Sequence, residues 1–166
     1  MQNKKISKYI TEMAKIDQDL RFMAGKEKSL VNFMVYAIDA IHNYRIKMII
    51  EKYSYPTQKL IGKDAMSSFW LLIQHQDYDI DLQENCLKYC DFEPKDKSHL
   101  TDRVLMNKGE KQIYGTQFKL FSKGKTALYP IKDRKNVNKL RKQAGLEKIE
   151  DYIKRHLKIT GFSYEE

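Results

Sequence analysis

Apolar residues recur every three or four positions along most of this chain, and this period constrains it to a mainly helical fold. Two long stretches, residues 5–24 and 29–52, each carry one apolar stripe, and Gly25 is predicted to end the first helix. Residues 63–75 are apolar on nearly every side, which is typical of a buried central helix. Four further helices are predicted over 79–90, from about 98 to 107, over 134–143 and over 147–158. Thr57 is predicted to cap the chain after Pro56, and Ser98 or Asp96 to cap the helix that ends at Asn107.

The helical period stops at Gln112, where β-favouring residues surround Gly115. A glycine in a strand pattern marks a bulge or a place where another group approaches the backbone closely. Residues 113–121 and 126–131 flank a short loop that contains Gly124, which predicts a β-hairpin. The predicted fold is therefore mainly α: a single-domain bundle of about seven helices over residues 1–166, with one small antiparallel β-hairpin near 113–131.

Composition narrows the class of protein. With 166 residues, of which 42% are hydrophobic and 32% charged, the chain is typical of one globular domain. It contains no run of about 20 apolar residues, so we predict a cytoplasmic protein that does not cross a membrane. The net charge of +9 resides in residues 119–158, which hold 13 Lys and Arg against 4 Asp and Glu. These cations do not gather on one helix face, so we interpret them as a solvated surface, with binding of nucleic acid or another polyanion as the less favoured hypothesis.

Several short motifs occur in a fixed order along the chain. They include Tyr55-Pro-Thr57, Gln74-His75-x-Asp77, Asp102-Arg103 and Gln112-x-Tyr-Gly-Thr-Gln117. This set resembles a bacterial domain-of-unknown-function family that is marked by Trp-Pro-Thr, Gln-His-x-Asp and Tyr-Gly-Thr-Gln motifs, with Tyr55 here in place of the Trp. The resemblance extends from about residue 15 to residue 152. It implies no particular activity.

His75 is the first candidate for chemistry. It shares a helix face with apolar residues, and an imidazole that is oriented through one nitrogen can act as acid or base through the other. Asp77 is predicted either to orient His75 or to cap the helix near residue 79. Gln74 is predicted either to bind a ligand or to fix a neighbouring strand, because a buried amide needs hydrogen-bond partners.

Asp102 and Arg103 form a second polar group. Adjacent residues on a helix point about 100° apart, so these two cannot easily pair with each other. The Arg103 guanidinium could bind a carboxylate or phosphate, or form a structural ion pair with Asp133 or Asp17.

The third polar group is the segment 112–117. Strand alternation predicts Tyr114 and Thr116 on one face, with Gly115 and Gln117 on the other, unless a bulge changes the order. Tyr114 could donate a proton, while Gln112, Thr116 and Gln117 could position a substrate. Alternatively, these side chains tie the hairpin to the helices.

Common catalytic signatures are absent from the sequence. It contains no phosphate-binding loop, no dinucleotide fingerprint and no metal-ligand spacing among its four histidines, so we predict no metal and no cofactor. We interpret the chain as a small enzyme with a polar pocket between the central helix and the hairpin. The pocket would use His75, Asp77 and Tyr114 for catalysis, and bind a small anionic or amide-bearing ligand. The alternative is a non-catalytic interaction domain in which the same residues form a buried polar network.

Overall fold

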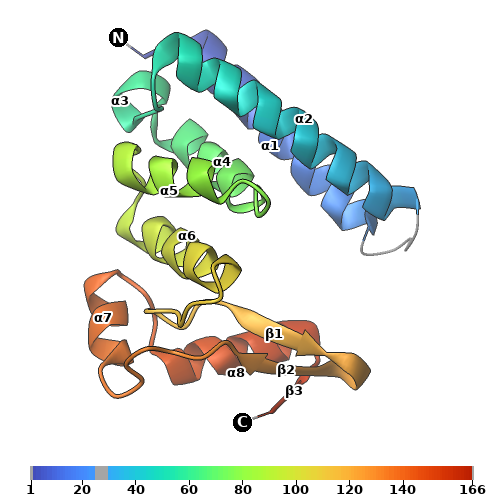
Figure 1. Ribbon diagram of the computed structural model, residues 1–166, viewed down its shortest axis with the longest axis vertical. Coiled ribbons are helices and arrows are strands. Elements are labelled where there is room, and N and C mark those ends of the chain that lie inside the picture. The colour runs from blue at the N-terminus through green and yellow to red at the C-terminus, as the bar shows by residue number, and fades with distance from the viewer. Residues whose placement is uncertain (1, 25–29, 166) are drawn as a thin grey trace. The chain divides into compact units, whose positions relative to one another are not determined.

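The computed structural model describes residues 2–24 and 30–165 of the chain. Within these residues it contains eight α-helices and a small three-stranded sheet (Figure 1), which confirms the mainly helical prediction. The contacts divide the chain into two compact units, Met1–Phe92 and Glu93–Glu166, which we call the N-terminal unit and the C-terminal unit. The single-domain organisation stays a prediction. The predicted helix stop at Gly25 lies outside the described residues.

The N-terminal unit is built on two long helices that lie side by side, α1 (Lys4–Ala24) and α2 (Leu30–Tyr53) (Figure 1). Three shorter helices follow, α3 (Gln58–Ile61), α4 (Lys63–Gln74) and α5 (Ile80–Tyr89). Helix α4 packs against α1 and α5. The core contains apolar residues that are at most 1% exposed, among them Ile10, Met13, Ile46, Phe69, Leu72 and Ile73. The central, buried helix predicted over 63–75 is therefore confirmed.

Helix α3 was not anticipated from the sequence, because its four residues are too few to show a period. Its N-terminus is nevertheless the predicted one. The Thr57 hydroxyl accepts a hydrogen bond from Leu60 N at 3.3 Å, so Thr57 is the N-cap.

The C-terminal unit contains α6 (Pro94–Asn107), the strands β1 (Phe118–Phe121) and β2 (Lys125–Leu128), α7 (Val137–Gln143), α8 (Ile149–Thr160) and β3 (Ser163–Tyr164). Strands β1 and β2 pair antiparallel, in the register Phe118 opposite Leu128, which confirms the hairpin. The short β3 adds to β2 in parallel, an addition that the sequence did not predict. Helix α8 holds the hairpin through the His156 ring, which stacks on Phe118 with ring centroids 3.7 Å apart.

Two predicted boundaries in this unit are wrong. Helix α6 begins at Pro94, which fixes the helical φ of the first turn, so neither Asp96 nor Ser98 is its cap. The Ser98 hydroxyl instead donates to Pro94 O within the helix at 2.8 Å. Helix α7 begins at Val137 rather than near 134, because Asp133 accepts two hydrogen bonds from Asn136 and holds the preceding residues in a turn.

The predicted first strand is also too long. Residues 113–117 are not a strand, and Gln112 forms only an isolated bridge with Ile131. The backbone at Gly115 has a φ of +70°, which interrupts an extended chain. Backbone N–H groups of this segment donate instead to the carboxylate of Asp102 on α6.

Candidate functional site

The His75 side chain lies at the end of α4 and faces a buried carboxylate on α1. Its Nδ1 is 3.0 Å from Asp17 Oδ2. The Asp17 side chain is 0% exposed and the His75 side chain 14% exposed. Of the two roles predicted for Asp77, orienting His75 belongs instead to Asp17, 58 positions before His75 in the chain.

The charge state of Asp17 fixes the tautomer of His75. Burial raises the pKa of Asp17, but hydrogen bonds from His75 and Gln18, and the positive charges of protonated His75 and of Arg21, outweigh burial. The net pKa of Asp17 is therefore below the usual 3.8. An ionised carboxylate can only accept, so we assign the imidazole proton to Nδ1. Arg21 Nε also lies 3.1 Å from this Nδ1, and with the proton there its N–H is directed to Asp17 Oδ1, at the same distance. Nε2 forms no hydrogen bond with any residue that the structure describes. With Nδ1 protonated, the remaining nitrogen that can exchange a proton is Nε2.

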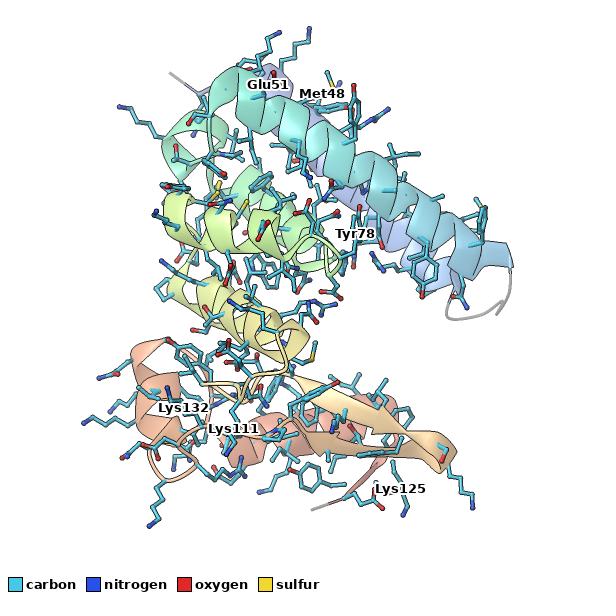
Figure 2. All side chains as sticks on the ribbon, viewed as in Figure 1. Met48, Glu51, Tyr78, Lys111, Lys125 and Lys132 are labelled. Atoms are coloured by element: carbon cyan, nitrogen blue, oxygen red, sulfur yellow. The ribbon has the colours of Figure 1, made fainter. Side chains whose placement is uncertain are left out.

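Arg21 joins Asp17 to a second carboxylate. Its Nε donates to Asp17 Oδ1 at 3.1 Å, and its Nη2 donates to Asp39 Oδ1 on α2 at 2.6 Å. Burial raises the pKa of Asp39, and Arg21 opposes this effect. The backbone of Asp39 is held as well, because the Tyr78 hydroxyl donates to Asp39 O at 3.1 Å, and Figure 2 shows Tyr78 at the connection between α4 and α5. We call Asp17, Arg21, Asp39 and His75 the His75 cluster.

Three members of this cluster, Asp17, Arg21 and Asp39, were not among the predicted site residues. Asp17 and Asp39 are at most 8% exposed although each lies on an amphipathic helix, and Arg21 is one turn after Asp17. The available signal was a charged residue on the apolar face of a helix, since a buried charge requires a partner. His42 carried the same signal: it is 1% exposed, burial lowers its pKa, and its Nδ1 has no hydrogen-bond partner among the described residues.

Asp77 and Gln74 also lie near the C-terminal end of α4, but they are not members of the His75 cluster. Asp79, not Asp77, is the N-cap of α5 and accepts from Leu82 N at 3.1 Å, so the predicted capping role of Asp77 is wrong. Asp77 Oδ1 lies 3.5 Å from the amide nitrogen of Gln83, which is buried. Gln74 is half-buried and is the last residue of α4. A catalytic role for Asp77 and a binding role for Gln74 stay predictions.

In the C-terminal unit, Asp102 is the centre of a second polar cluster. It is 0% exposed, and its two oxygens accept hydrogen bonds from the backbone N–H groups of Ile113, Tyr114 and Thr116 at 2.7 to 3.1 Å. The Thr116 hydroxyl donates to the same carboxylate at 3.0 Å. Burial raises the pKa of Asp102, and these donors oppose the effect. Because every one of these groups donates, the arrangement fits the ionised carboxylate.

Residues 113–117, which we call the loop, are also held by Arg141 on α7. It is 1% exposed, and its Nη1 donates to Tyr114 O at 2.8 Å and to Gly115 O at 3.2 Å. Its Nε donates to Glu147 O at 2.7 Å. Burial lowers the pKa of Arg141, and nearby negative groups oppose this effect. The loop is thus held through its N–H groups by a buried anion and through its C=O groups by a buried cation.

The side chains of Gln112 and Gln117, at either end of this segment, form further hydrogen bonds within the C-terminal unit. Gln112 is 0% exposed, and its amide nitrogen donates to Tyr129 O at 2.7 Å while its amide oxygen accepts from Gln117 N at 2.9 Å. Gln117 donates to the Thr116 hydroxyl at 3.0 Å. These contacts are internal to the C-terminal unit and hold its backbone. Binding roles for Asp102, Gln112, Thr116, Gln117 and the half-buried Arg103 stay predictions, as does a catalytic role for the half-buried Tyr114.

The predicted site residues therefore fall into two clusters. His75, Gln74 and Asp77 belong to the N-terminal unit, whereas Asp102, Arg103, Gln112, Tyr114, Thr116 and Gln117 belong to the C-terminal unit. Among the residues that the structure describes, no group of three or more His, Cys, Asp or Glu has the arrangement of a metal site.

One titration in the C-terminal unit gives a pH prediction. Burial, followed by the charges of Arg141, Lys95 and Arg155, lowers the pKa of His99 from 6.5 to about 4. The unfolded chain takes up this proton below pH 6.5, while the folded chain resists it, so stability is lost as the pH falls from about 6.5 to about 4. We expect His99→Gln to flatten this part of the pH dependence, measured by urea unfolding at pH 7 and pH 5. An unchanged pH dependence would contradict the assignment.

The fold and the two clusters define a mainly helical protein with buried polar networks. Residues 5–163 match the model of a family of unknown function, DUF6624, and the chain belongs to that family. No curated protein and no solved structure matches the chain significantly. In the described ranges, none of the helices combines the length and the apolar character that crossing a membrane requires.

Proposed function

We propose that the N-terminal unit carries a general acid–base site in which His75 Nε2 accepts and returns a proton. The observation that supports this function is the pairing of His75 Nδ1 with the buried Asp17 carboxylate at 3.0 Å, with Nε2 unpaired among the described residues. A carboxylate on one imidazole nitrogen orients the ring and fixes the tautomer, so that the other nitrogen is the reactive one.

The charges in the His75 cluster indicate which class of substrate it would bind. One guanidinium, Arg21, lies between two carboxylates, so the cluster has no excess positive charge that would attract an anion. Arg21 is 29% exposed, and its Nη1 is unpaired among the described residues, which leaves an N–H for a carbonyl oxygen. We therefore favour a small amide-bearing substrate over an anionic one. His75 would activate water or a hydroxyl group, and Arg21 would donate to the carbonyl.

A cytoplasmic location belongs to the same proposal. Cys86 and Cys90 are both free and buried, and thiols persist in a reducing compartment.

The test compares His75→Gln and Asp17→Asn with the native protein on a panel of p-nitroanilides and p-nitrophenyl esters. We expect turnover of at least one amide or ester, and a loss of about 10²-fold or more in kcat in both variants, which is the usual contribution of a positioned base. His156→Gln is the matched control, because it removes an imidazole from the C-terminal unit and should leave the rate unchanged.

A second readout does not depend on finding the substrate. Diethyl pyrocarbonate modifies an unprotonated imidazole nitrogen, so His75 should react readily at Nε2 and more slowly after Asp17→Asn changes its orientation. If no substrate is turned over and the reactivity of His75 does not respond to Asp17, while both variants lower the Tm, the cluster is structural.

That outcome would support the second candidate function, a non-catalytic interaction domain. The observation that favours it is the closed network in the C-terminal unit. There Asp102 accepts from backbone N–H groups between residues 113 and 116, and Arg141 Nη1 donates to two carbonyl groups of the same segment. Networks of this kind can be kept for specificity of fold alone.

A further inference from the structure

The two long helices of the N-terminal unit expose apolar residues at heptad spacing. Tyr9, Ile16 and Met23 on α1 are 36%, 46% and 52% exposed, and each is seven positions from the next. Met34, Ile41 and Met48 on α2 repeat this spacing and are 44%, 46% and 50% exposed. Figure 2 shows Met48 projecting from α2. Seven residues are close to two helical turns, so each set forms a stripe along one side of its helix.

The two stripes run along the same pair of helices, and a groove lies at the end of the stripes where Tyr9 and Met48 stand. When two neighbouring helices run in opposite directions, the residue numbers of positions that lie opposite each other add up to a constant. The pairs 9 and 48, 16 and 41, and 23 and 34 each add up to 57. Tyr9 and Met48, the first of these pairs, line the same groove of about 510 Å³. Ile6 and Ile49, which are 5% and 6% exposed, also line it. We call this groove, together with the two exposed stripes that extend from it, the outer groove.

Positive charge borders one end of the outer groove. At the end lined by Tyr9 and Met48, the lining residues include Lys5, Lys8, Arg45 and Lys52, and one acidic residue, Glu12. The Arg45 guanidinium lies 5.6 Å from the centre of the Tyr9 ring, and the Lys52 ammonium 5.3 Å from that of Tyr53. These cations therefore lie beside apolar surface, where a carboxylate that reaches them is only partly screened by water.

We propose that the outer groove binds an acidic amphipathic helix of a partner protein. A groove between two helices accepts a third helix whose apolar residues repeat every seven positions, because the side chains of the three helices can then interdigitate. From Tyr9 to Met23 the stripe is about 21 Å long at 1.5 Å per residue, the length of three apolar layers and longer than most small ligands. Carboxylates beside the apolar stripe of the partner would meet Lys5, Lys8, Arg45 and Lys52.

The same charges disfavour a second copy of this chain as the occupant. A symmetric dimer with the helices in the same direction would bring the four cations of each groove together. With the helices in opposite directions, they would face the layer of Met23 and Met34, where the nearest exposed acid on α1 is Asp19. Only a partner that supplies its own carboxylates satisfies both the apolar layers and the charge.

The experiment uses the full-length protein and two synthetic helices of three heptads, with identical Leu stripes flanked by Glu in one and by Lys in the other. We expect fluorescence anisotropy to show the acidic peptide binding at least about tenfold more tightly than the basic one. The double variant Lys8→Gln and Arg45→Gln should reduce this preference. Ile16→Glu should abolish binding, because it places a carboxylate in the central layer.

Thr11→Glu is the matched control, because it adds the same charge at an exposed position of α1 that belongs to neither apolar stripe, and it should leave binding within twofold. Circular dichroism checks that each variant keeps its helix content. The proposal is overturned if both peptides bind equally or if neither binds. It is also overturned if the native protein is a dimer that Ile16→Glu dissociates, or if only anionic phosphatidylglycerol vesicles bind in an Ile16-dependent way.

Discussion

Replacing Asp102 with Ala should lower the free energy of unfolding of the C-terminal unit by about 4 kcal/mol, because three backbone N–H groups and one hydroxyl lose their acceptor. The loss is large because Asp102 is 0% exposed, so water cannot readily replace the carboxylate. Asp102→Asn keeps one oxygen acceptor and should lose about half as much. Glu110→Ala, which removes an exposed carboxylate from the same unit, should change the free energy by less than about 0.5 kcal/mol.

The readout must report on the correct unit. The single tryptophan, Trp70, lies on α4 in the N-terminal unit, so its fluorescence does not follow the C-terminal unit directly. Hydrogen exchange of the amides at 113, 114 and 116, measured by mass spectrometry, reports on the loop itself. A loss below about 1 kcal/mol with unchanged protection of these amides would show that Asp102 does not hold the loop.

Replacing Gly115 with Ala should cost about 3 kcal/mol, through two separable effects. The φ of +70° is unfavourable for any residue with a Cβ. In addition, a Cβ at this position would lie 2.5 Å from Ile149 Cδ1 and 2.8 Å from Ile131 Cδ1, which is closer than carbon atoms approach. Urea unfolding monitored by hydrogen exchange of the loop measures the total.

Two further variants separate these effects. Gly109→Ala has a similar φ of +74° and no heavy atom within 4 Å of the added Cβ, so it should cost only about 1 kcal/mol. Combining Gly115→Ala with Ile149→Val and Ile131→Val removes both Cδ1 atoms and should recover part of the steric loss. If the valines recover nothing, or if Gly109→Ala costs as much as Gly115→Ala, close packing at Gly115 is not the cause.

Helical periodicity predicted most of this fold, because each helix buries a face whose spacing is visible in about ten consecutive residues. The segment 113–117 was misjudged for a physical reason. Its residues favour strands, but the N–H groups that a strand would pair are used by Asp102, which is 11 to 14 positions away on another element. Gly115 did indicate a close approach to the backbone, and Ile149 and Ile131 make it.

In the candidate site, too, the decisive contact joins residues that are far apart in the sequence. Asp77 is the acidic residue nearest to His75 in sequence, and local spacing selected it. The structure selects Asp17, because α4 packs against α1 and the Asp17 carboxylate is buried at that contact. Pairings between helices depend on tertiary packing, which no local window of sequence contains.

The contacts of Asp102 and Arg141 also have a consequence for sequence variation in this family. Both residues recognise N–H and C=O groups, which are the same for every amino acid at 113 and 114. The conformation of the loop is therefore specified from outside it, by one residue on α6 and one on α7. Substitutions of the Ile113 and Tyr114 side chains should therefore leave the path of the chain unaltered, whereas substitutions of Asp102, Arg141 or Gly115 should alter it.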